Sequence, residues 1–172
     1  DEIYEGSAGP SPSEFYRLMR EGSMPKSQAV NPAVVEKTFR EILDAGKDIL
    51  YISFSSALSG SCDIVRMVAK QLVEEEYPDA VIEVIDSLCV SLGEGLLVNK
   101  ALAMQAQGKT LAEVRDWLVE NAVHVCVKFT VDDLFHLQRG GRVSKATAVG
   151  GSVLNLKPVL TLTPEGKLEA AG

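Results

Sequence analysis

Four serines and one glycine stand within FSSALSGS, which runs from position 54 to 61, directly after the apolar run DILYIS. Serine hydroxyls and the unpaired backbone N–H groups at the start of a helix are donors suited to an anion, and Gly60 would let the backbone approach it closely. The pattern predicts either an anion site at the end of a buried strand or a turn whose serines bond to nearby backbone groups.

Other chemistries have less support in the sequence. The G-x-S-x-G pattern of a nucleophilic serine is absent, and neither His124 nor His136 has a context that places it beside Ser59. The three cysteines lack a C-x-x-C pair, so they indicate buried reduced thiols rather than a disulfide framework or a zinc site. We therefore expect no metal, no cofactor and no catalytic constellation.

Two further polar segments flank predicted elements. PKSQAVNP (25–32) holds Ser27 in a loop between two prolines. DSLCVSLGEG (86–95) follows the end of a second apolar run, and Asp86 could orient a hydroxyl or accept a proton there. Capping of a helix N-terminus is the interpretation of Asp86 that we favour.

A basic segment, QRGGRVSK (138–145), gathers Arg139, Arg142 and Lys145 in an otherwise acidic chain. Such a cluster could bind a phosphate or an acidic partner, and its two glycines predict a sharp turn. The formal net charge of the 172 residues is −7, which disfavours binding to nucleic acid or to an anionic membrane. No apolar run approaches the roughly 20 residues of a membrane span. The reduced thiols favour a cytoplasmic protein, which is the localisation we expect.

The elements that position these segments alternate along the chain. Helix-start signals precede apolar periodicity at Ser11-Pro12, Asn31-Pro32, Ser91 and Thr110, the last with Glu113 as a capping box, and a further helix is predicted from Cys62 to Tyr77. Short β-rich runs predict strands over 48–54, 80–86, 123–129 and 156–162. This alternation predicts an α/β fold with a mostly parallel sheet flanked by helices. Ligands of such sheets bind beyond the carboxyl ends of the strands, where FSSALSGS lies.

Four segments, in this order, resemble motifs of the DegV family. PKSQAVNP resembles P-K-T-S-Q-P-x-P, SSALSGS resembles S-S-x-L-S-G-T, and IDSLCVSLGEG resembles D-S-x-x-x-S-x-G-x-G. The most specific match is LFHLQRGGRVSKATAVGGSVLNLKPVL, which resembles L-x-x-L-K-x-G-G-R-I followed by a helix and L-N-I-K-P-I-L.

The resemblance implies a two-domain α/β protein that binds one long-chain fatty acid in a tunnel between its domains. Some members of the family are the acyl-carrying subunit of a bacterial fatty acid kinase, in which a separate ATP-binding subunit phosphorylates the bound carboxylate. The family begins with a further strand and ends with a longer second domain, so we expect this chain to be an internal piece. On this basis residues 1–124 would form the first domain without its first strand, and residues 125–172 the start of a truncated second domain.

Carried over position by position, the carboxylate-binding hydroxyls of the family fall on Ser27 and Ser59, and Gly60 adds a backbone donor. Arg142 matches the arginine of G-G-R and, with Asp86 and Ser91, is a candidate for contact with the head group or the kinase subunit. The serine and proline that follow the family's threonine are replaced here by Gln28 and Val30, flanking Ala29.

Two alternatives stay open from the sequence. A dihydroxyacetone-kinase-like phosphotransferase would hold a small hydroxylated substrate on a histidine, so His124 or His136 would have to serve. An interaction or regulatory module would retain the fold without using the head-group site.

Overall fold

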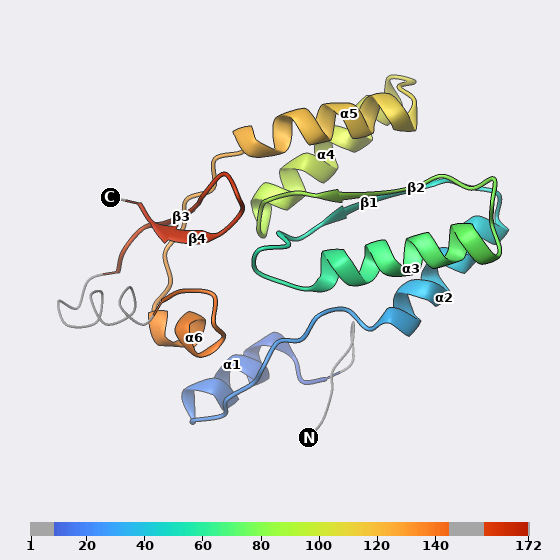
Figure 1. The fold of residues 1–172 in the computed structure, drawn as a ribbon. Helices are drawn as coiled ribbons and strands as arrows, with labels where there is room; N and C mark the ends of the chain where they lie inside the picture. Colours follow the sequence, from blue (N-terminus) through green and yellow to red (C-terminus); the bar gives the residue numbers. More distant parts are fainter. Residues whose placement is uncertain (1–8, 145–156, 172) are drawn as a thin grey trace.

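A computed structural model describes residues 9–144 and 157–171 of the chain (Figure 1). The helices and strands, in chain order, are α1 (Pro12–Arg20), α2 (Pro32–Asp44), β1 (Ile49–Ser53), α3 (Ser61–Glu75), β2 (Ile82–Asp86), α4 (Leu92–Ala106), α5 (Leu111–Asn121), the 3-10 helix η1 (Ala122–His124), α6 (Leu134–Arg139), β3 (Leu160–Leu162) and β4 (Leu168–Ala170). The predicted α/β fold is confirmed.

The first sheet is parallel, with β1 beside β2 from Ile49 opposite Ile82 to Ser53 opposite Asp86. Helices α2 and α3 cover one face of this pair and α4 and α5 the other, which makes a three-layer arrangement (Figure 1). Each layer contact is apolar, and Phe39 and Leu72 are among the buried residues on the first face. Both strands run toward the same end of the sheet, so the loops that follow them lie side by side.

The predicted helix starts are confirmed where the signal is local. The side chain of Ser11 accepts a hydrogen bond from the amide of Glu14 at 3.3 Å, and that of Asn31 accepts one from Ala33 at 3.0 Å. At α5 both bonds of the capping box between Thr110 and Glu113 are present.

The carboxylate of Glu113 is strongly stabilised in this box. A hydrogen bond from Lys109, followed by bonds from the backbone and side chain of Thr110, lowers the pKa of Glu113 to about 2. Each of these donors favours the charged carboxylate, and the bonds with Thr110 define the N-terminus of α5.

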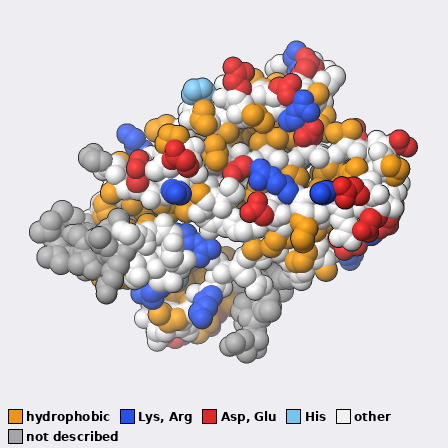
Figure 2. All heavy atoms as spheres, viewed as in Figure 1, with side chains coloured by type: hydrophobic (Ala, Val, Ile, Leu, Met, Phe, Trp, Pro, Cys, Tyr) orange, Lys and Arg blue, Asp and Glu red, His pale blue; other side chains and the backbone are white. Residues whose placement is uncertain are grey.

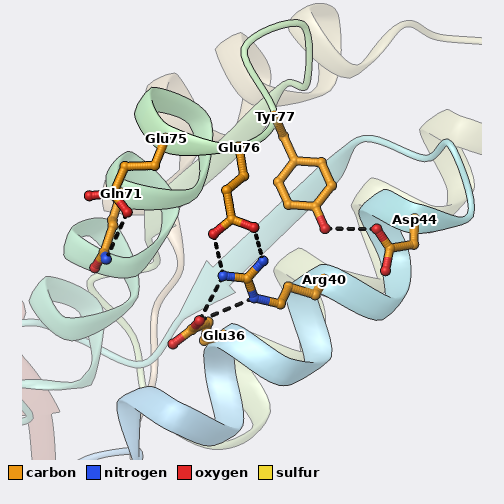
Figure 3. Close-up of polar contacts among 7 residues, drawn as sticks. All are labelled: Glu36, Arg40, Asp44, Gln71, Glu75, Glu76 and Tyr77. Atoms are coloured by element: carbon orange, nitrogen blue, oxygen red, sulfur yellow. Dashed lines mark hydrogen bonds and ion pairs between the residues drawn. The ribbon is translucent and has the colours of Figure 1, made fainter.

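A polar cluster joins α2 to the end of α3 on the surface (Figure 3). The guanidinium of Arg40 bonds to Glu36 on its own helix and to both carboxylate oxygens of Glu76. Tyr77 donates to Asp44 at 2.7 Å. These contacts lie at the opposite end of α3 from the serine loop, so they hold the layer together without reaching the predicted site.

The prediction of a strand over 123–129 is wrong. Residues 122–124 form η1, and the bridge between Phe129 and Leu160 is the one isolated bridge among the described residues. The strand predicted over 156–162 is confirmed only for β3, while Leu156 lies outside the described residues. β3 pairs antiparallel with β4, so a separate two-stranded hairpin follows the parallel layer.

Candidate functional site

The serine loop, residues 54–60, connects the carboxyl end of β1 to the first residue of α3. Its root is fixed by two fully buried serines: Ser53 donates to the carbonyl of Phe54 at 3.0 Å, and the amide of Ser55 donates to the carbonyl of Cys89 at 2.9 Å. The second bond reaches the loop after β2. The polar groups of Ser53 and Ser55 are therefore satisfied by the end of the strand and by the neighbouring loop.

Ser59 lies where the loop turns into α3. Its amide donates to the carbonyl of Ser55 at 3.1 Å, and its hydroxyl lies 2.9 Å from that of Ser61. Gly60 is the residue before the helix, is exposed, and has no atom within 4 Å of the place where a side chain would begin. The N-terminus of α3 thus combines a hydroxyl pair with open space, an arrangement that can receive an anion.

Ser61 lies at the N-terminus of α3. It is the first residue of the helix, and the side chain of Ser61 accepts a hydrogen bond from the amide of Val30 at 3.1 Å. This bond joins the serine loop to the loop of residues 25–31, in which Ser27 is exposed. Ser27 therefore lies three residues from the point where the two loops meet.

Asp86 does not cap a helix. Its carboxylate accepts hydrogen bonds from the amide of Leu88 at 3.0 Å and from the amide of Ser56 at 3.2 Å. The side chain thereby ties the end of β2 to the serine loop. Leu88, with φ of +52°, has a backbone conformation that side chains rarely adopt, and the bond from its amide to Asp86 helps to hold it there.

Ser91 stands just before α4, with φ of +50° and no hydrogen bond from its side chain to the helix. It is exposed, as is the neighbouring Leu92, which keeps 87% of its accessible surface. Within the described residues, Ser91 forms no hydrogen bond with the serine loop. Ser91 is therefore exposed in a strained backbone position.

The two described arginines of the basic segment have different partners. Arg142 Nε donates to the carbonyl of Leu58 at 3.0 Å, next to Ser59. Arg139 instead forms an ion pair with Asp133 at 3.5 Å, and Lys145 lies outside the described residues. The predicted sharp turn is confirmed at Gly141, whose φ is +76°.

A contact with the hairpin was not foreseen from the sequence. The hydroxyl of Ser55 donates to the carbonyl of Gly166, in the turn between β3 and β4, at 2.8 Å. Figure 1 shows this hairpin beside the ends of the parallel strands. The only signal in the sequence was the T-P-E-G turn at 163–166, which says nothing about its partner.

Other reactive groups stand apart from this site. Burial raises the pKa of the thiols of Cys62 and Cys89, whereas Cys126 is exposed. His124 on η1 and His136 on α6 are both exposed. Among the described residues, no group of three His, Cys, Asp or Glu side chains could hold a metal ion, and no helix is long and apolar enough to cross a membrane. Acidic and basic side chains are interspersed on the face shown in Figure 2.

Three comparisons relate the chain to known proteins. The model of the DegV family, described as uncharacterised, matches residues 1–172. A DegV domain-containing protein of Clostridium perfringens is 42% identical over 158 residues, which are 92% of this chain and 54% of that protein. The chain thus spans little more than half the length of the curated relatives it matches.

Solved structures share the fold. A DegV family protein from Thermus thermophilus, described by its fatty acid binding, has a TM-score of 0.84 and 34% identity, covering 99% of this chain and 59% of that one. The fatty acid kinase B3 protein of Streptococcus pneumoniae, loaded with linoleic acid, has a TM-score of 0.81 and 24% identity, covering 93% and 56%. The second likeness is one of fold alone.

Proposed function

The chain belongs to the DegV family, and from this membership we propose that the protein binds one long-chain fatty acid, with the carboxylate held by Ser27, Ser59 and Gly60. The T. thermophilus protein, at 34% identity and described by its fatty acid binding, supports the ligand class. Ser27 and Ser59 are carried over from the motifs of the family, and the contacts of the serine loop support Ser59 and Gly60.

The single observation that carries the proposal is the meeting of three distant segments at the start of α3. Ser61 receives the amide of Val30, Arg142 donates to Leu58, and the hydroxyls of Ser59 and Ser61 lie 2.9 Å apart. Hydroxyl and amide donors at a helix N-terminus stabilise a carboxylate without a buried countercharge.

Most of the affinity would come from the acyl chain. Burial of one CH₂ group yields about 0.8 kcal/mol, so a sixteen-carbon tail supplies on the order of 10 kcal/mol before losses to ordering. A few donors then suffice to fix the head group. We place the tail in an apolar tunnel between a first domain, residues 1–124, and a second that starts at about residue 125.

The finer part of the proposal is that the protein is a carrier, without chemistry of its own, for a separate ATP-binding kinase subunit. Arg142 is the residue we assign to the phosphorylated head group or to this subunit. Its guanidinium bonds to the carbonyl of Leu58, the residue before Ser59, and it belongs to the G-G-R motif. Exposed Ser91 is a second candidate for that contact. Asp86, engaged with two backbone amides, is assigned to the shape of the loops instead.

The test is mass spectrometry of organic extracts from the full-length purified protein, with thermal unfolding in the presence of added fatty acids. We expect a C14–C18 acid at near-equal molar ratio and a rise in Tm with the same acids. Extracts free of fatty acid, combined with an unchanged Tm, would reject the proposal. To test the kinase step, labelled ATP and the kinase subunit are added, and acyl-phosphate is the product sought.

A further inference from the structure

The turn of the β3–β4 hairpin packs directly on the serine loop. Gly166 is buried, and its carbonyl accepts the hydroxyl of Ser55 at 2.8 Å. A Cβ atom at position 166 would lie 2.2 Å from Ser55 Oγ and 3.2 Å from the Cα of Leu88. Since real Cβ atoms essentially never lie as close as 2.2 Å to another heavy atom, an alanine at this position would force the Ser55 hydroxyl or the turn to move.

Ser55 connects the hairpin turn to Ser59 through its backbone carbonyl. The carbonyl of Ser55 accepts the amides of Leu58 and Ser59, both at 3.1 Å, while its own amide donates to Cys89. One fully buried residue thus joins the hairpin, the loop after β2 and the residue proposed to bind the carboxylate. A displacement of Ser55 would move the amide and hydroxyl of Ser59 with it.

The hairpin touches the loop after β2 as well. Leu88 also lies close to Gly166 and has a φ of +52°. The amide of Leu88 donates to the carboxylate of Asp86, which also accepts the amide of Ser56. The turn therefore lies over the junction of both loops, at the carboxyl ends of the two parallel strands (Figure 1).

The turn is well ordered by its own contacts. The amide of Gly166 donates to the carbonyl of Thr163 at 2.9 Å, and the hydroxyl of Thr163 accepts the amides of Glu165 at 3.2 Å and Lys167 at 3.3 Å. A turn held in this way can act as a fixed support for a loop packed on it.

We propose that Gly166, with Ser55, is a positioning residue for the head-group site: the hairpin turn sets the place of Ser59. This inference rests on the proposed function, since it assigns a role to the turn in recognition of the same carboxylate. Its consequence is a selective one. The turn contributes to the preference for an acid over an uncharged head group, and leaves the acyl chain unaffected.

The experiment compares hexadecanoic acid with hexadecanol on the full-length protein, because the two ligands share a tail and differ in the head group. In Gly166→Ala we expect the Kd for hexadecanol divided by the Kd for hexadecanoic acid to fall by about tenfold. This fall corresponds to the loss of one hydrogen bond to a charged group. The affinity for hexadecanol is expected to stay within about twofold of wild type, a change below that of one neutral hydrogen bond.

Gly108→Ala is the matched control. Gly108 has a φ of +80°, close to the +75° of Gly166, but no atom lies within 4 Å of the place of its Cβ. This variant carries the same backbone strain without the contact, and we expect it to retain the wild-type preference for the acid.

Thr163→Val supplies the decision if Gly166→Ala does not fold. It removes the hydroxyl that organises the turn and keeps the volume of the side chain, so we expect a fall of about threefold in the acid preference. A wild-type preference for the acid in folded Gly166→Ala, or in Thr163→Val where Gly166→Ala does not fold, overturns the inference alone. A wild-type protein that binds acid and alcohol equally overturns the proposed function, and the inference with it.

Discussion

Removal of the Ser59 hydroxyl is the perturbation that bears most directly on the proposed carboxylate site. In Ser59→Ala the loop keeps its backbone bond to Ser55 but loses the contacts of the Ser59 hydroxyl with the hydroxyl and amide of Ser61, together with one donor to the ligand. A hydrogen bond to a charged group contributes about 1.5–3 kcal/mol, and the Kd for hexadecanoic acid should rise by about 10- to 100-fold.

Ser55→Ala is the comparison within the same loop. The change leaves the buried carbonyl of Gly166 without its donor, which should lower the free energy of unfolding by about 1–3 kcal/mol. The carbonyl of Ser55 still receives the amide of Ser59, so the Kd should change less than in Ser59→Ala.

The assay pairs displacement of a fluorescent fatty acid with urea unfolding, both on the full-length protein. Ser59→Thr, which keeps a hydroxyl, should bind within a few-fold of wild type. If Ser55→Ala and Ser59→Ala raise the Kd equally while Ser55→Ala leaves stability unchanged, the division of roles within the loop is refuted.

Three further changes probe other parts of the molecule. Arg142→Ala should lower acyl-phosphate formation by the kinase subunit at least tenfold while the fatty-acid Kd changes little, and Arg139→Ala, on the same turn of chain but paired elsewhere, should alter neither; equal effects would remove Arg142 from that role. Phe39→Ala should cost about 3–5 kcal/mol of unfolding free energy, against less than about 0.5 kcal/mol for the exposed Val34→Ala, as measured in urea. The pKa of Glu113 is lowered from 4.5 to about 2, so its stabilising effect is complete above about pH 4.5 and is lost as the pH falls toward 2; Glu113→Gln should flatten this part of the urea-midpoint profile, and an unchanged slope would contradict the assignment.

Features that depend on neighbouring residues could be predicted from the sequence. The starts of α1, α2 and α5 follow from side chains that bond within three residues, and the order of helices and strands follows from apolar periodicity. The hydroxyl pair of Ser59 and Ser61 is equally local, because the two residues are separated by one position in FSSALSGS.

The strand predicted over 123–129 failed for a physical reason. VHVCVKF has the β-branched alternation of a strand, but a strand forms only where a neighbour offers backbone groups along its whole length. Among the described residues, the backbone of this segment forms a bridge only at Phe129, opposite Leu160. β-propensity depends on the residues of the segment alone, whereas the hydrogen bonds of a strand depend on a partner segment that is about thirty residues away in the sequence.

The contacts that define the site have the same long range. Arg142 reaches Leu58 across 84 residues and Ser55 reaches Gly166 across 111, so no local pattern could have paired them. Arg142 and Gly166 both lie after residue 124, and both form hydrogen bonds with the serine loop. These two bonds tie the serine loop to the C-terminal part of the chain. We therefore expect a change at the Ser55–Gly166 contact to weaken head-group binding, and a change at Arg142 to act on phosphorylation of the head group rather than on the fatty-acid Kd.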